Sequence, residues 1–170
     1  MIGAWSPGQW ALRVTMVLGV LVALASTTLV GVVPDWWLVL VVTGLALGFA
    51  SSPESHAGAV AMAFVVVWWG VSLRDGLHPE ALLAAAGLLA SHVAGLLAAY
   101  GPDELSVDAA TVRRWVFRGL ASFLLAPAVW LVAVLLRDRP EAPGVWVAGL
   151  TVALIATVAA SMAFTAQEPT

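Results

Sequence analysis

The chain has 170 residues, of which 62% are hydrophobic and only 10% charged, and its formal net charge is −3. A soluble domain usually carries about 25% charged residues, so this composition excludes an ordinary soluble fold and indicates a protein whose solvent is lipid. The negative net charge gives no basic field to attract nucleic acid. With no cysteine, disulfides, thiolate metal sites and iron–sulfur clusters are excluded as well.

The charged residues divide the chain into six charge-free windows, at 14–34, 36–53, 55–73, 81–102, 119–136 and 142–167. A helix needs about 20 apolar residues to cross a bilayer, with a range of roughly 17–25, and every window meets this length. We therefore predict an all-α fold, one transmembrane domain with six spanning helices at about 12–33, 36–50, 56–73, 79–100, 113–136 and 144–166. The second and third windows only just reach the required length, so an alternative reading has four full spans and a re-entrant hairpin at 36–73.

Both readings place the two termini on the same side of the membrane, and the arginines indicate which side this is. The side of the termini collects four of the seven basic residues: Arg13, Arg113, Arg114 and Arg118. Because cytoplasmic segments of membrane proteins carry an excess of basic residues, this distribution favours cytoplasmic termini in a plasma membrane.

Small residues recur at four-residue spacing in the predicted helices and indicate close helix packing. Lipid gives helices no hydrophobic drive to associate, so membrane bundles depend on small residues that let backbones approach. One such series lies in the helix at 79–100 and contains Gly87, Ser91 and Gly95. Pro127 removes one backbone hydrogen bond and predicts a kink in the helix at 113–136.

The longest polar stretch, GPDELSVDAATVRRW at 101–115, leads into that kinked helix. Ser106 is the expected N-cap, so the helix should begin outside the hydrocarbon, near residue 107. Arg113, Arg114 and Arg118 then lie at the level of the lipid headgroups. They are either anchors that reach toward the membrane surface or a docking site for a soluble partner.

Two histidines, His56 and His92, are the candidates for chemistry. They lie on neighbouring predicted helices, and counting back from the turn near residue 76 places them about 6 Å apart in depth. A histidine pair can ligate haem, whereas a metal site needs further ligands, of which Glu54 is the only obvious one. The simpler reading is a pair of neutral histidines hydrogen-bonded within the bundle, with Ser55 capping the helix at 56–73. We predict no cofactor, no metal and no catalytic residue.

Two segments, 52–69 and 92–118, carry a set of distinctive motifs: Pro53, Ser55-His56-Ala57, His92, Tyr100-Gly101-Pro102 and Arg113-Arg114-Trp115. In these motifs the chain resembles an uncharacterised family of small multi-pass membrane proteins from high-GC Gram-positive bacteria. That family is associated with genes for MoxR-type ATPases and von Willebrand-type membrane proteins. The resemblance implies a bacterial plasma membrane location and an accessory part in envelope assembly, and it supplies no catalytic residues.

The sequence contains no recognisable nucleophile–base pair, phosphate-binding loop or acidic metal motif, and no Asp, Glu or Arg lies within an apolar window. Transporters and pumps generally carry ionisable groups there. We expect a non-enzymatic accessory, scaffold or assembly component of a membrane protein complex, with the lipid bilayer and a membrane protein or a second copy as partners. One alternative is a small transporter, channel or lipid-handling protein. A second is a haem- or metal-binding membrane protein that uses His56 and His92.

Overall fold

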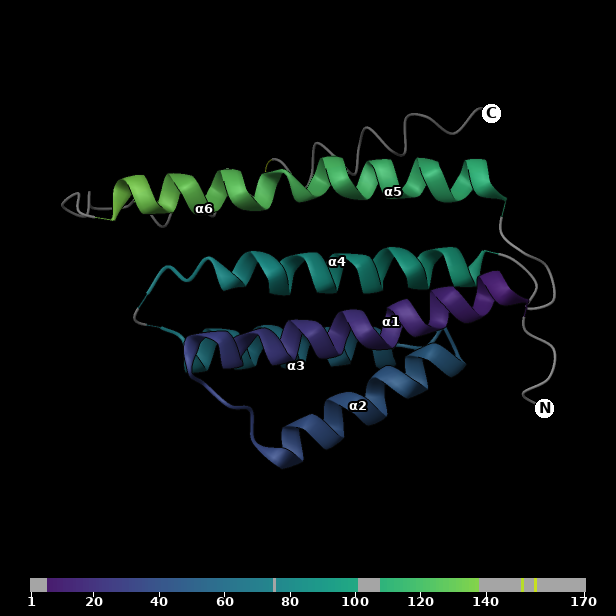
Figure 1. Ribbon diagram of the computed structural model, residues 1–170, viewed down its shortest axis with the longest axis horizontal. Helices are drawn as coiled ribbons and strands as arrows, with labels where there is room; N and C mark the ends of the chain where they lie inside the picture. The colour runs from purple at the N-terminus through teal and green to yellow at the C-terminus, as the bar shows by residue number, and fades with distance from the viewer. Residues whose placement is uncertain (1–5, 75, 101–107, 138–150, 152–154, 156–170) are drawn as a thin grey trace. The chain divides into compact units, whose positions relative to one another are not determined.

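The computed structural model describes residues 6–74, 76–100, 108–137, 151 and 155 (Figure 1). Every regular element in this part of the chain is helical, which confirms the predicted all-α class for the described residues. The elements in chain order are α1 (Pro7–Ala25), the 3₁₀ helix η1 (Ser26–Val30), α2 (Trp36–Ser51), α3 (Ala57–Ser72), α4 (Glu80–Ala99), α5 (Ala109–Phe123) and α6 (Leu125–Leu136).

The first helix begins and ends with local hydrogen bonds that its sequence supplies. Ser6 caps α1 by accepting from the Gln9 N–H at 3.3 Å, and Pro7 occupies the first turn, where its missing N–H costs nothing. At the other end, a run of hydroxyl side chains bonds back to carbonyls three residues earlier, and this tightens the chain into η1. Gly31, with φ of 83°, then adopts the left-handed conformation that ends the helix.

Three helical stretches of the described chain are long and apolar enough to cross a membrane: Pro7–Val30, Glu80–Ala99 and Ala109–Leu136. The two shorter apolar helices, α2 and α3, have 16 residues each. At 1.5 Å rise per residue each covers about 24 Å, less than the ~30 Å hydrocarbon core. The described residues therefore contain three helices of spanning length and a hairpin of two shorter ones.

The closest helix contact joins α1 to α4 through backbone atoms. A Cβ atom added at Gly87 would lie 2.6 Å from the Gly19 carbonyl oxygen, and one added at Gly19 would meet the Gly87 carbonyl oxygen. One turn away, the Ser91 hydroxyl donates a 2.7 Å hydrogen bond to the Met16 carbonyl. Small side chains are thus what allows these two helices to touch, as the packing of membrane helices requires.

The apolar core lies where α1 meets α2, α3 and α4. One cluster of buried side chains joins all four helices and contains Val20, Ala23, Leu24, Leu38, Val42, Ala46, Ala61, Val65 and Ala84. A second cluster gathers around the Phe49 ring, which fills the space that Gly58 of α3 and Gly95 of α4 leave open. The Trp69 indole N–H completes the contact by donating to the Ala23 carbonyl at 3.0 Å.

Several helix boundaries differ from the predicted ones, for local reasons. The helix that was predicted to start near residue 107 and to cross the membrane at 113–136 begins at Ala109, because the Asp108 carboxylate caps it by accepting from the N–H groups of Ala110 and Thr111 at 3.1 Å. The same helix is interrupted at Leu124, three residues before Pro127, which lacks the N–H that would bond back to Phe123. Ser106 and nearly all of the predicted helix at 144–166 lie outside the described residues.

The turn before α3 also differs from the prediction. The N-cap of α3 is His56 rather than Ser55, and no side chain bonds to the exposed backbone donors there. The Ser55 N–H instead donates to the Ser52 carbonyl at 2.9 Å, which closes a tight turn one residue before the helix. The Ser55 hydroxyl is buried without a hydrogen-bond partner.

Candidate functional site

Helix α5 separates its apolar and basic residues onto different faces. Its apolar residues recur at intervals of three and four: Val112, Val116, Gly119, Leu120 and Phe123. At 100° per residue these five positions share one side of the helix. That side faces α4 and α1, Arg114 and Arg118 lie away from it, and Arg113 lies at its edge beside Leu120. The amphipathic pattern of the sequence therefore fixes how α5 is rotated against its neighbours.

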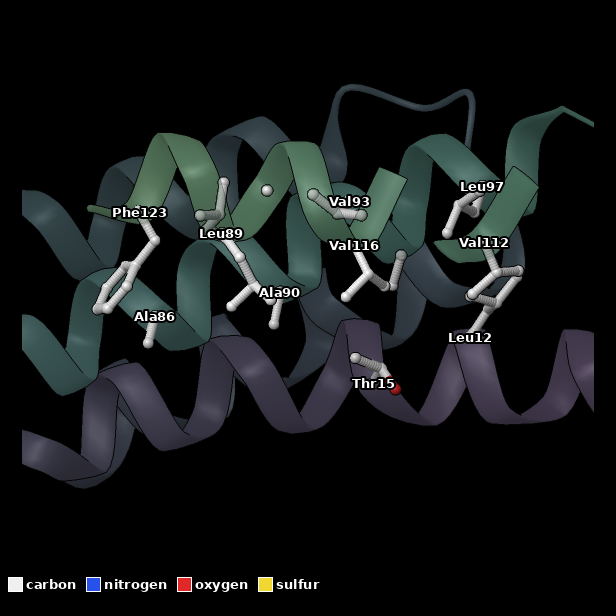
Figure 2. Close-up of a pocket in the computed structure, with 13 residues that line it drawn as sticks. Leu12, Thr15, Ala86, Leu89, Ala90, Val93, Leu97, Val112, Val116 and Phe123 are labelled. Atoms are coloured by element: carbon white, nitrogen blue, oxygen red, sulfur yellow. The ribbon is translucent and has the colours of Figure 1, made fainter. Parts of the chain in front are cut away.

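Between α5, α4 and α1 lies a groove with a volume of about 430 Å³ (Figure 2). Helix α4 contributes Ala86, Leu89, Ala90, Val93, Ala94 and Leu97 to it, and α1 contributes Leu12 and Thr15. Thr15 is the one lining residue with a polar side chain, and its hydroxyl donates to the Ala11 carbonyl of its own helix at 2.8 Å. The groove therefore offers an apolar surface and suits a hydrocarbon ligand better than a hydrated solute.

The two ends of the groove differ in their surroundings. At one end Val112 lies beside Leu97 and Leu12, near the first turn of α5, and at the other Phe123 lies near Ala86 (Figure 2). The first of these ends is close to the start of α5 and the end of α4. It is therefore the end that lies nearer the membrane surface if these helices cross the bilayer.

The arginines of α5 are all exposed. The Arg118 guanidinium carbon lies 6.0 Å from the centre of the Trp115 ring, and the Trp115 ring centre lies 6.0 Å from that of Tyr100. These contacts fit an aromatic and basic layer where polar headgroups meet hydrocarbon. Arg113 precedes the groove-lining residue Leu120 by seven positions, so the two residues point in nearly the same direction from the helix.

A second polar feature, which the sequence did not reveal, lies inside the bundle. Arg13 is only 3% exposed, and its guanidinium donates to the Ala50 carbonyl in the last turn of α2. That carbonyl has no partner within its own helix, and a cation is favourable at a helix C-terminus. Gln9, one turn before Arg13, is also fully buried, and its amide has no hydrogen-bond partner in the described structure.

The sequence placed Arg13 at a boundary because charged residues were taken to mark helix ends. A usable signal was present, because Gln9, Arg13, Met16 and Val20 share one helical face with the buried part of α1. Arg13 acts in the described structure as the group that closes the C-terminus of α2.

The two predicted histidines lie at different places in their helices, one at the start of α3 and one inside α4. His56 is the exposed N-cap residue of α3, and His92 is exposed on α4, next to Ser91. Within the described residues no group of three His, Cys, Asp or Glu side chains is placed to hold a metal ion. That the two histidines form hydrogen bonds within the bundle stays a prediction.

The remaining predicted interaction residues fall into two groups. Gly87, Ser91 and Gly95 lie in the contacts of α4 with α1 and α2, whereas Arg113, Arg114 and Arg118 are exposed on α5 and Pro127 is half-buried in α6. Comparisons with protein-family models, with curated proteins and with solved structures find no match to this chain.

Proposed function

We propose that the protein is a multi-pass membrane protein that acts as a non-catalytic accessory, scaffold or assembly component of a membrane protein complex. The main support is the contrast between its long helices. α1 and α4 contain seven and six buried residues, whereas α5 and α6 contain none in the described structure. A 28-residue apolar stretch that gains so little from its own bundle is suited to packing against another membrane protein.

In this proposal six helices cross the bilayer, with both termini in the cytoplasm of a bacterial plasma membrane. The polar turn at 51–56 supports a full crossing by α2 and α3, because Ser51, Ser52 and Glu54 are exposed. A re-entrant hairpin would carry these groups, including a carboxylate, into the hydrocarbon, which is costly. The short length of α2 and α3 is met by local thinning of the bilayer.

Cysteine labelling tests this topology, since the native chain has no cysteine. A single cysteine at position 53 should react with a membrane-impermeant maleimide from the cytoplasmic side, and one at position 76 from the opposite side. Labelling of both from one side, or protection of position 53 from both sides, would rule out six crossings.

Site-specific photocrosslinking in cells tests the accessory role. A photoreactive residue at Phe117 or Leu124, which are 71% and 67% exposed, should give a discrete crosslinked product with a partner membrane protein. Matched positions on the other side of the bundle, Leu40 and Val67, are 63% and 61% exposed and should give none. Mass spectrometry of the product, together with mild-detergent co-purification of the unmodified chain, identifies the partner.

The mass and position of the crosslinked products distinguish a partner protein from a second copy of the chain. A product with twice the mass of the chain would indicate a homo-oligomer instead of a partner protein. Equal products from both sides of the bundle, or none from α5 and α6, would contradict the proposed docking of a partner on these helices.

A further inference from the structure

The groove between α1, α4 and α5 has a length that matches one membrane leaflet. Its lining on α5 runs from Val112 to Phe123, eleven residues apart, which is about 16 Å along the helix. Half of the ~30 Å hydrocarbon core is about 15 Å. The groove thus extends from the helix ends near the membrane surface to about the bilayer centre. A docked transmembrane helix would require a groove along the whole span, so the dimensions favour a single lipid chain.

The charge at the surface end of the groove favours an anionic lipid. Arg113 lies on the side of α5 that carries Leu120, about two turns nearer the start of the helix, and its side chain is exposed. Arg114 is the next residue and is exposed too. Among the described residues, neither Arg113 nor Arg114 forms an ion pair with an acidic side chain. Basic residues beside a cleft between membrane helices are suited to bind lipid phosphate.

We propose that this groove binds one acyl chain of an anionic phospholipid, whose phosphate lies at Arg113. The apolar walls on α4 and α5 bury the chain, and the guanidinium supplies charge and hydrogen-bond donors to the phosphate oxygens. This inference shares with the proposed function only the placement of the helices in a membrane. It does not depend on a partner protein.

Binding is measured on the purified full chain by native mass spectrometry, with phosphatidylglycerol and phosphatidylcholine of identical acyl chains as probes. We expect one tightly retained lipid per chain and a preference for phosphatidylglycerol. Arg113→Gln should weaken phosphatidylglycerol binding about fivefold, as expected for one basic residue at the membrane surface, and should weaken phosphatidylcholine binding less, because the choline cation already offsets the phosphate charge of that lipid. Arg74→Gln is the matched control, because Arg74 follows α3 at the opposite end of the bundle, and it should change neither affinity.

The acyl-chain part of the proposal is tested by filling the groove. Gly119 lines it, and a Cβ atom added there would meet only the Val93 side chain, at 3.4 Å. Gly119→Trp should therefore abolish retention of both lipids. Gly70→Trp adds the same bulk to α3, where a Cβ atom would have no neighbour within 4 Å, and should retain lipid like the native chain. If Gly119→Trp does not fold, Ala90→Leu fills the groove more gently from α4.

Three results would overturn the proposal. They are equal affinity for the two lipids, an equal fall in affinity for both after Arg113→Gln, and undiminished retention in the folded groove-filling variants. A fourth refuting result would be that the native chain retains neither lipid, as expected if the groove is already filled by protein. The lipid assay contains only the purified chain and lipid. Its result can therefore refute lipid binding while crosslinking still finds a partner protein, and lipid binding can be found while crosslinking finds no partner.

Discussion

Replacing Gly19 by alanine perturbs the backbone contact between α1 and α4 and allows the energy of that contact to be estimated. The added Cβ atom would meet the Gly87 carbonyl oxygen and would lie 2.9 Å from the Ser91 Cβ and 3.0 Å from the Ser91 backbone nitrogen. These are backbone or backbone-near atoms, which cannot rotate away. Helix α4 must therefore shift outward as a unit, and the Ser91 hydrogen bond to Met16 lengthens with it.

The expected cost combines two contributions. Overpacking of a well-packed core typically costs about 1–3 kcal/mol, and a hydrogen bond between membrane helices contributes about 0.6 kcal/mol on average. Against this, alanine is favoured over glycine in a helix interior by about 0.5–1 kcal/mol. We therefore expect Gly19→Ala to lower the free energy of unfolding by about 1–3 kcal/mol.

Gly44→Ala provides the matched control, because a Cβ atom at Gly44 in α2 has no neighbour within 4 Å. Only the gain in helix propensity remains there, so this variant should be neutral or stabilised by up to about 1 kcal/mol. Both variants are unfolded by titration with denaturing detergent in the same micelles, followed by circular dichroism. Equal unfolding free energies for the two variants would refute the assignment of Gly19 to a backbone contact.

Further substitutions test other parts of the structure. Ser91→Ala removes the donor to the buried Met16 carbonyl and should cost about 0.5–2 kcal/mol in the same unfolding assay; a neutral result would mean that this bond contributes nothing. Asp108→Ala should cost about 1 kcal/mol and reduce the helical signal, whereas Asp108→Asn keeps the cap and should stay near the native value. His92→Leu changes an exposed side chain and should alter stability by less than about 0.5 kcal/mol. A bound haem, seen as a Soret band that is lost in His56→Ala or His92→Leu, would contradict the prediction that the protein holds no cofactor.

The helical class and the approximate position of each described helix could be predicted from the sequence, because both depend on local chemistry. Charged residues avoid hydrocarbon whatever the fold, so their spacing alone marks the apolar stretches. The start of α1 was predicted too late for a related reason. This helix begins with a capping side chain, Ser6, followed by an arginine that the helix carries within it, Arg13. A boundary drawn at the charge misses the first turns.

The candidate site could not be predicted, because it depends on how separate helices meet. The spacing of Val112, Val116 and Phe123 gives the apolar face of α5, but only its placement beside α4 creates a groove. In the same way the sequence identifies Gly95 as a small residue, and only the fold shows that the Phe49 ring occupies the space beside it. The burial of Arg13 depends on a carbonyl 37 residues away.

The contact between α1 and α4 also has a consequence for how the protein is made. The Ser91 hydroxyl and the Met16 carbonyl are 75 residues apart in the chain, so their bond cannot form until α4 has been synthesised. Until then Gly19 and the Phe49 ring lack the α4 backbone that covers them in the folded chain. An intermediate of this kind exposes apolar surface that can pair wrongly with other nascent chains. The order of synthesis therefore makes completion of α4 the step at which α1 and α2 acquire their final packing.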